Sequence, residues 1–335
     1  MRIAQYQLVT AVFIAALATL APTPAVHAAD GLTGVSSVRA LADDRTLGAS
    51  QEATISRFAE EAGRALSARN PSEDHLEAVR IDLMAPLSGG CTPAFARAYG
   101  ARLLEAFGEY DDDNRTPQQQ MIAFAVLSAT GSNASLLDMA ERIVDLDTET
   151  APWKPMAMCQ TLSQGVAKAT TLDLAERNRS DLARIFGRIA SRVSPSANRH
   201  VMEGFVMLGG GEREDIARRW ADALKSLASR ETVAAEDLLC MEGATVKLRT
   251  VLLNPATRET RDAREAAARA LAPALLAFHA RAADHLDGDG VENDRLRAHL
   301  GRVDQVLPFL DVRGVSLGAL WDAKDSAGLR GLLSN

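Results

Sequence analysis

The chain has 335 residues, 47% of them hydrophobic, and its 37 basic against 44 acidic side chains give a formal net charge of −7. This length suffices for one large domain or two ordinary ones, with a core that needs no disulfide or metal for stability. The acidic balance argues against a nucleic-acid-binding protein, which would present a basic face to phosphates.

Residues 1–28 have the pattern of a secretory signal peptide. Arg2 precedes an uncharged, mostly apolar run from Leu8 to Leu20, and Val26 and Ala28 suit cleavage after Ala28, although Ala29 would also serve. A retained N-terminal anchor is the alternative. That run is too short to span a bilayer, and no later stretch has 18 uncharged apolar residues, so we expect no integral membrane segment after cleavage. The sequence thus predicts a periplasmic or secreted bacterial protein.

Hydrophobic residues in the remaining chain recur at the spacing of one helix face. The sets that share a face are Ile55, Phe58, Ala62 and Leu66; Phe95, Tyr99, Leu103 and Phe107; Leu182, Ile185, Phe186 and Ile189; Ile216, Trp220, Leu224 and Leu227; and Leu296, Leu300, Val303 and Leu307. Residues 121–129, MIAFAVLSA, are apolar all round, which is typical of a helix enclosed by neighbours. Because alternating strand patterns are almost absent, we predict an all-α chain.

Several helix starts are marked by a capping side chain followed by proline, whose missing N–H costs nothing in the first turn. These pairs are Asn70–Pro71, Thr92–Pro93, Thr116–Pro117, Ser194–Pro195 and Asn254–Pro255. Glu73 and Gln119 lie three residues after a cap, where they can complete a capping box.

The first three of these prolines lie at 71, 93 and 117, so two successive helices occupy about 46 residues, the helix-pair period of HEAT and armadillo arrays. We therefore predict an irregular α-solenoid of stacked helix pairs, HEAT/armadillo-like. A compact helical bundle or an α/α ring is the alternative, because no side-chain consensus repeats from pair to pair. Residues 29–335 are expected to form a single all-helical domain, with any subdivision near 209–211.

The segment GVSLG at 314–318 fits the G-x-S-x-G pattern of a hydrolase nucleophile, but its context does not. That motif needs a preceding strand and a histidine later in the chain, whereas the last histidine is His299. We expect Ser316 to cap one of the last helices instead.

His200 and Glu203 lie three residues apart on one predicted helix face, a spacing that a metal site can use. This H-x-x-E is similar to a motif of exported helical proteins of the imelysin type, although the glycine expected two residues before the histidine is Asn198 here. The resemblance implies a periplasmic metal-binding protein or enzyme that uses His200 and Glu203. A surface or hydrogen-bonded histidine is the alternative.

Residues 284–295, DHLDGDGVENDR, resemble the short calcium loops of dockerin and thrombospondin type-3 repeats. In the frame that fits best, His285 holds the first ligand position, Asp287 the third, Asp289 the fifth, Gly290 the sixth and Leu296 the twelfth. The first and twelfth positions thus lack the usual carboxylates. Asp287, Asp289 and Asn293 are predicted to bind calcium weakly, and a solvated acidic turn is the alternative.

The chain has three cysteines, Cys91, Cys159 and Cys240, so at least one thiol has no partner within the chain. Export would allow the other two to form a disulfide.

Because no convergent catalytic set is found, we expect an exported helical-repeat scaffold that presents a surface to a protein or peptide partner. No cofactor is expected beyond a weak structural calcium ion.

Overall fold

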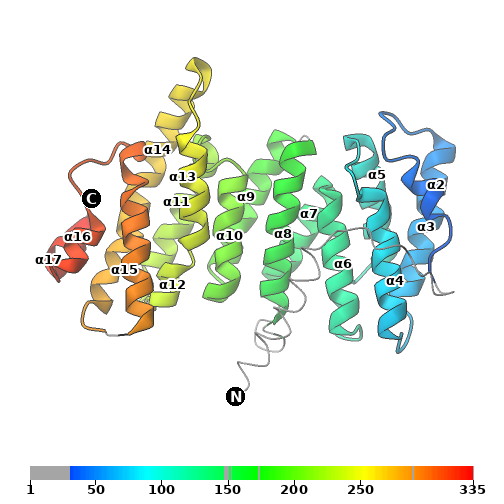
Figure 1. Cartoon of the computed structure of the whole chain (residues 1–335), viewed down its shortest axis with the longest axis horizontal. Helices are drawn as coiled ribbons and strands as arrows, with labels where there is room; N and C mark the ends of the chain where they lie inside the picture. The colour runs from blue at the N-terminus through cyan, green and yellow to red at the C-terminus, as the bar shows by residue number, and fades with distance from the viewer. Residues whose placement is uncertain (1–30, 147–150, 152, 173, 289, 335) are drawn as a thin grey trace.

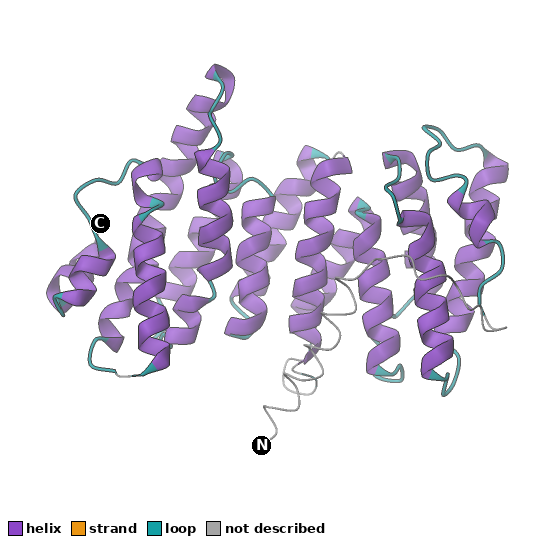
Figure 2. Cartoon of the chain, in the orientation of Figure 1, coloured by secondary structure: helices purple, strands orange, loops and turns teal. Residues whose placement is uncertain are grey.

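The computed structural model describes residues 31–146, 151, 153–172, 174–288 and 290–334. Over these residues the secondary structure is helical without strands, which confirms the all-α prediction (Figure 2). The predicted signal peptide at 1–28 lies outside the described residues. The helices stand side by side in two layers, and together they form an elongated solenoid (Figure 1).

In the first layer each helix packs against the next along the solenoid. Its members are α3 (Ala49–Leu66), α5 (Pro93–Phe107), α7 (Asn133–Asp145), α9 (Glu176–Ala190), α11 (Glu214–Ala228) and α14 (Arg258–Ala280). The first four begin at residues 49, 93, 133 and 176, at intervals of 44, 40 and 43 residues. This period is close to the 46 residues predicted from the prolines, and the stacked helix pairs of a solenoid are confirmed.

In the second layer, too, each helix packs against the next, and this layer covers one face of the first. Its members are α4 (Glu73–Met84), α6 (Pro117–Thr130), α8 (Trp153–Leu172), α10 (Pro195–Met207), α13 (Glu242–Leu253) and α15 (Val291–Asp304). Shorter helices fill the ends and corners: α2 (Val35–Arg39), α12 (Ala235–Leu239), α16 (Leu317–Asp322) and α17 (Ser326–Gly331). Four 3₁₀ turns accompany them, at Ala85–Leu87, Arg281–His285, Leu307–Leu310 and Leu332–Ser334.

Helix α6 is enclosed, as its apolar sequence predicted, because it has α4 and α8 on either side and also packs on α5 and α7. Its Ile122, Phe124, Val126 and Leu127 are all buried. Helix α11, at the opposite extreme, buries one face and exposes a charged one. Apolar residues all round a helix therefore indicate neighbours on all sides, and an apolar stripe indicates neighbours on one side.

Three of the five predicted helix starts are correct. Thr92 and Thr116 accept hydrogen bonds from the third backbone N–H of α5 and α6, and Gln119 completes the capping box. Helix α10 begins at Pro195 as predicted, but the Ser194 hydroxyl bonds to the Ser196 hydroxyl rather than to a backbone N–H of the helix.

The two asparagine–proline starts are wrong. Helix α4 begins after Ser72, whose hydroxyl accepts from the third N–H, while Asn70 takes a left-handed conformation with φ 50°. Helix α14 begins after Thr257, and Asn254 instead ends α13. In both cases a hydroxyl two or three residues further along provides the cap, so the prolines lie in the preceding turns.

Close contacts between the layers fix the helix positions. Helix α10 approaches α9 at Gly204, where a Cβ atom would lie 2.3 Å from Cε2 of Phe186. Next to this contact the rings of Phe205 and Trp220 stack with centroids 6.0 Å apart. These aromatic residues form the centre of a core that runs the length of the solenoid.

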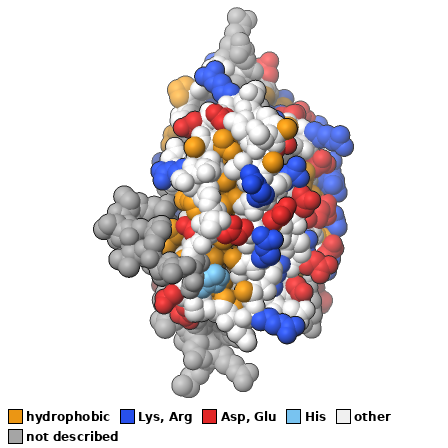
Figure 3. Space-filling model, turned by 90° about the vertical axis from the view of Figure 1, so that its right-hand side faces the viewer, with side chains coloured by type: hydrophobic (Ala, Val, Ile, Leu, Met, Phe, Trp, Pro, Cys, Tyr) orange, Lys and Arg blue, Asp and Glu red, His pale blue; other side chains and the backbone are white. Residues whose placement is uncertain are grey.

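Figure 3 shows the end of the solenoid formed by α2–α4, where hydrophobic side chains gather in the middle of the face and charged ones lie densely along one side. Ile81 of α4 is one of the exposed large hydrophobic residues. In the part of the chain that is described, no helix combines the length and apolar composition needed to cross a membrane.

Candidate binding groove between α5 and α7

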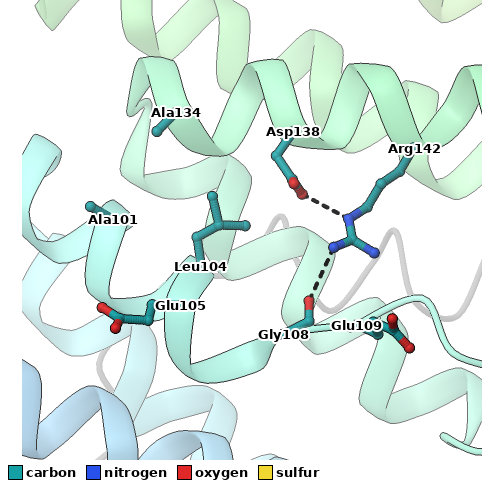
Figure 4. Close-up of a pocket in the computed structure, with 8 residues that line it drawn as sticks. All are labelled: Ala101, Leu104, Glu105, Gly108, Glu109, Ala134, Asp138 and Arg142. Atoms are coloured by element: carbon teal, nitrogen blue, oxygen red, sulfur yellow. Dashed lines mark hydrogen bonds and ion pairs between the residues drawn. The ribbon is translucent and has the colours of Figure 1, made fainter.

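A shallow groove of ≈ 460 Å³ lies between α5 and α7, on the face of the first layer that points away from the second layer. Its α5 side consists of Ala101, Leu104 and Glu105 on the helix and of Gly108 and Glu109 just after it (Figure 4). Its α7 side is a stripe of residues at four-residue spacing, Ala134, Asp138 and Arg142.

The groove is hollow because the residues that would fill it are small. Ala101 and Ala134 face each other at one end, and Gly108 ends α5 at the other with φ 55°, a conformation that favours glycine. Helices α5 and α7 also approach closely beside the groove, since a Cβ on Gly100 would lie 2.5 Å from Ser132. Leu104 thus forms a half-buried apolar floor between two closely held helices.

Arg142 fixes one end of the groove. Its Nε donates to Asp138 at 2.8 Å and its Nη2 to the carbonyl of Gly108 at 3.3 Å (Figure 4). Its Nη1 donates to Asp111 at 2.5 Å. The guanidinium also lies over the ring of Tyr110, 4.6 Å from its centroid. This set of contacts ties the end of α5 to α7 and holds Arg142 in one orientation.

The protonation states at this end are well defined. Burial opposes the charge of Arg142, but the hydrogen bond and charge of Asp138 outweigh it and raise the arginine pKa. Burial, followed by the charge of Asp138, raises the pKa of Tyr110 far above its usual range, so the phenol stays protonated and donates to Asp138 at 2.7 Å. Asp138 thus accepts hydrogen bonds from two donors, the Tyr110 hydroxyl and Arg142 Nε.

The groove carries a negative charge overall. Among its lining residues, three carboxylates at Glu105, Glu109 and Asp138 stand against one guanidinium, which Asp138 and Asp111 already neutralise. Glu105 and Glu109 are exposed on the α5 side, and Glu105 also pairs with Arg102 of the same helix, whose Nη1 lies 3.0 Å from its carboxylate. An apolar floor beside an acidic wall matches a ligand that is both basic and apolar, such as an amphipathic peptide segment.

The predicted calcium loop lies between two helical segments, the 3₁₀ turn at Arg281–His285 and α15. Its side chains are partly committed to other bonds: His285 Nε2 donates to the carbonyl of Val233 at 2.7 Å, and the Asn293 amide donates to the carbonyls of His285 and Gly288. Asp287 is exposed, whereas Asp289 lies outside the described residues.

Within the described ranges there is no group of three or more histidine, cysteine or acidic side chains that could hold a metal ion. Calcium binding by Asp287, Asp289 and Asn293 stays a prediction.

Glu203 is occupied by basic partners. Its carboxylate accepts from Lys247 Nζ of α13 at 2.6 Å, and Arg199 Nε lies 3.6 Å away. It also lies directly against Gly243. His200 on the same helix is half-buried, and burial lowers its pKa. The structure thus places these two residues at a contact between α10 and α13 in which Glu203 forms the ion pair.

The three cysteines are all free. Burial raises the pKa of half-exposed Cys91, so its position before α5 does not make it an activated thiolate. Ser316 caps α16 through a hydrogen bond from the backbone of Ala319, as predicted.

Comparison with protein-family models, curated proteins and solved structures gives no match for this chain. The groove was not predicted from the sequence, because the apolar spacing of Phe95, Tyr99, Leu103 and Phe107 marks only the buried face of α5. Ala101 and Glu105 on the opposite face were the available signal, but this face becomes a groove wall only once α7 lies beside α5.

Proposed function

We propose that this chain is an exported helical-repeat scaffold protein, and that the α5/α7 groove binds a basic, amphipathic segment of a protein partner. The observation that carries the proposal is the pairing of an apolar floor at Leu104 with the exposed carboxylates of Glu105 and Glu109. A groove between rigid parallel helices suits a peptide, because its walls are already in place before binding.

Several further features support this proposal. The solenoid offers a long surface relative to its volume, which is the usual advantage of stacked helix pairs in binding partners. The net charge of −7 favours basic partners and disfavours nucleic acid. The alternative, a metal-binding protein or enzyme centred on His200 and Glu203, has less support, because Lys247 and Arg199 already neutralise the glutamate.

Selection from a random peptide library displayed on phage, with the chain from residue 29 onward as bait, tests the proposal. We expect enriched peptides to combine lysine or arginine with leucine or aromatic residues. Their affinity should weaken by about tenfold or more for a Glu105→Lys, Glu109→Lys variant, since two attractions become repulsions.

The matched control is Glu60→Lys, Asp222→Lys, which changes the net charge equally at exposed positions on α3 and α11. This variant should bind the enriched peptides nearly as well as the wild type. Enrichment of acidic peptides, or equal losses in both variants, would contradict the proposal.

A further inference from the structure

A second hollow, of ≈ 300 Å³, lies between α13 and α15, near the opposite end of the solenoid from the α5/α7 groove (Figure 1). It is lined by Thr245, Val246 and Arg249 of α13 and by Arg302 and Gln305 at the end of α15. Except for Val246, every lining side chain carries a hydrogen-bond donor, and none is a carboxylate. The chemistry of this cleft is therefore the reverse of that of the acidic groove.

The cleft keeps an excess of positive charge after its internal ion pairs are taken into account. Glu242 at the start of α13 binds Nη1 of Arg302 and lies 3.2 Å from Nη2 of Arg295. Burial works against ionisation of Glu242, but the hydrogen bonds from Arg302 and Arg295 prevail and lower its pKa. Arg249 is exposed and has no carboxylate partner among the residues that the structure describes.

Glu242 thus pairs with two arginines, and Arg249 adds a third positive charge beside the cleft, in a protein whose overall charge is negative. Arg249 and Arg302 come from different helices, so their guanidinium groups approach the cleft from its two sides. Arginines in this arrangement match the oxygens of a carboxylate or phosphate, because the planar fork can donate two parallel hydrogen bonds.

Thr245 is a second, independent indication of a ligand. Only 2% of this residue is exposed, and its hydroxyl is buried without a hydrogen-bond partner. Thr250 on the same helix instead satisfies its hydroxyl by donating to the carbonyl of Val246. A buried hydroxyl with no partner is unfavourable, and an acceptor oxygen in the adjoining cleft would remove that cost.

We propose that the α13/α15 cleft binds the oxyanion of a small ligand, a carboxylate or a phosphate group. Arg249 and Arg302 supply the charge, and Gln305 and Thr245 donate further hydrogen bonds. The volume is at the lower end of the range for small-molecule pockets, about 300–1,000 Å³, so only a small ligand or the anionic end of a larger one fits. This site is separate from the α5/α7 groove and does not depend on the function proposed there.

The test is an NMR titration of the isotope-labelled chain from residue 29 onward with inorganic phosphate and, separately, with succinate, at constant ionic strength set by chloride. We expect saturable shifts of backbone amides in α13 and α15. Saturation by phosphate alone identifies a phosphate site, and saturation by succinate alone identifies a carboxylate site.

Two variants locate the anion. Arg249→Gln should weaken binding by about tenfold through the loss of one charge-assisted contact. Thr245→Val should weaken binding by a few-fold and yet leave the protein as resistant to urea as the wild type or more so, because the unpaired hydroxyl is gone. Arg269→Gln on α14, whose side chain is 71% exposed, is the control and should bind as the wild type does.

Absence of saturable shifts in the wild type with both anions would overturn the proposal. Wild-type affinity in either Arg249→Gln or Thr245→Val would overturn it as well.

Discussion

Two buried histidines at the contact between α14 and α15 make the stability of the C-terminal helices depend on pH. His279 and His299 are both 0% exposed, and their Nε2 atoms lie 3.0 Å apart. His279 Nδ1 lies 2.8 Å from the carbonyl of Leu275, which can only accept, so this nitrogen carries the proton. His279 Nε2 must then accept from His299 Nε2–H, and His299 Nδ1 is left unprotonated and without a partner.

Protonation of either ring disrupts this arrangement. A proton on His279 Nε2 would face the N–H of His299, and a proton on His299 Nδ1 would create a buried charge with no acceptor. Burial accordingly lowers the pKa of His279 to about 4, and burial together with His279 and Arg302 lowers the pKa of His299 well below its usual value. Both rings are neutral in the folded protein at pH 7.

The direction and size of the effect follow from linkage. Because the folded-state pKa of His279 is below the unfolded value of about 6.5, the unfolded chain binds the proton more tightly. The contribution of neutral His279 to the free energy of unfolding is complete above about pH 6.5 and is lost as the pH falls towards 4. For His279 alone, the shift from 6.5 to about 4 corresponds to a loss of about 2 kcal/mol between pH 7 and pH 5. His299 adds to the loss in the same direction.

Urea denaturation followed by far-ultraviolet circular dichroism at pH 7, 6 and 5 measures this loss. The comparison is a His279→Gln, His299→Gln variant, which has no titratable ring at this position. We expect the free energy of unfolding of the variant, which lacks both rings, to fall by at least about 2 kcal/mol less than that of the wild type over this range. Equal falls in the two proteins would refute the argument, whatever the stability of the variant at pH 7.

Three further predictions concern the packing, the calcium loop and the N-terminus. Gly204→Ala should lower the free energy of unfolding by about 1–3 kcal/mol in urea denaturation, since its Cβ would overlap Phe186. The control is Gly187→Ala on α9, where a Cβ would meet no other side chain, and it should raise the free energy of unfolding by up to about 1 kcal/mol. Equal effects would contradict the packing of α9 against α10. Calcium at about tenfold over its dissociation constant should stabilise the wild type by roughly 1.4 kcal/mol in calorimetry, and an Asp287→Asn, Asp289→Asn variant should not respond; identical melting of the two would leave an acidic turn. N-terminal sequencing of protein exported by a bacterial host should give Ala29 or Asp30 as the first residue, and an intact Met1 in the membrane fraction would disprove the signal peptide.

The sequence predicted the architecture because a solenoid is built from local contacts. Each helix packs mainly on neighbours less than about 50 residues away, so the periodicity of apolar residues and the spacing of Thr92 and Thr116 were sufficient for the helix pairs. The failures at Asn70 and Asn254 were also local. Two caps competed within three residues, and the hydroxyl of Ser72 or Thr257 prevailed in the structure.

The sites were harder to predict because each depends on the register between helices. Asp138 and Arg142 of α7 face Leu104 and Gly108 of α5 only because Gly100 lets the two helices approach closely at Ser132. The ring of His279 bonds to that of His299, which is 20 residues away and on another helix. Neither relation leaves a contiguous motif in the sequence, whereas the contiguous motifs at His200 and Asp287 were visible at once.

Site-specific photo-crosslinking tests the proposed partner-binding groove most directly. A photoreactive phenylalanine derivative would replace Ala134, an exposed residue that lines the groove, and in a control protein it would replace the equally exposed Ala298 on α15. Each protein would be illuminated with the basic amphipathic peptide selected against the wild type. We predict a crosslink at position 134 that is lost in the Glu105→Lys, Glu109→Lys background, and none at position 298. Equal crosslinking at the two positions, or a crosslink at 134 that survives the charge reversal, would contradict the assignment of the α5/α7 groove as the binding site.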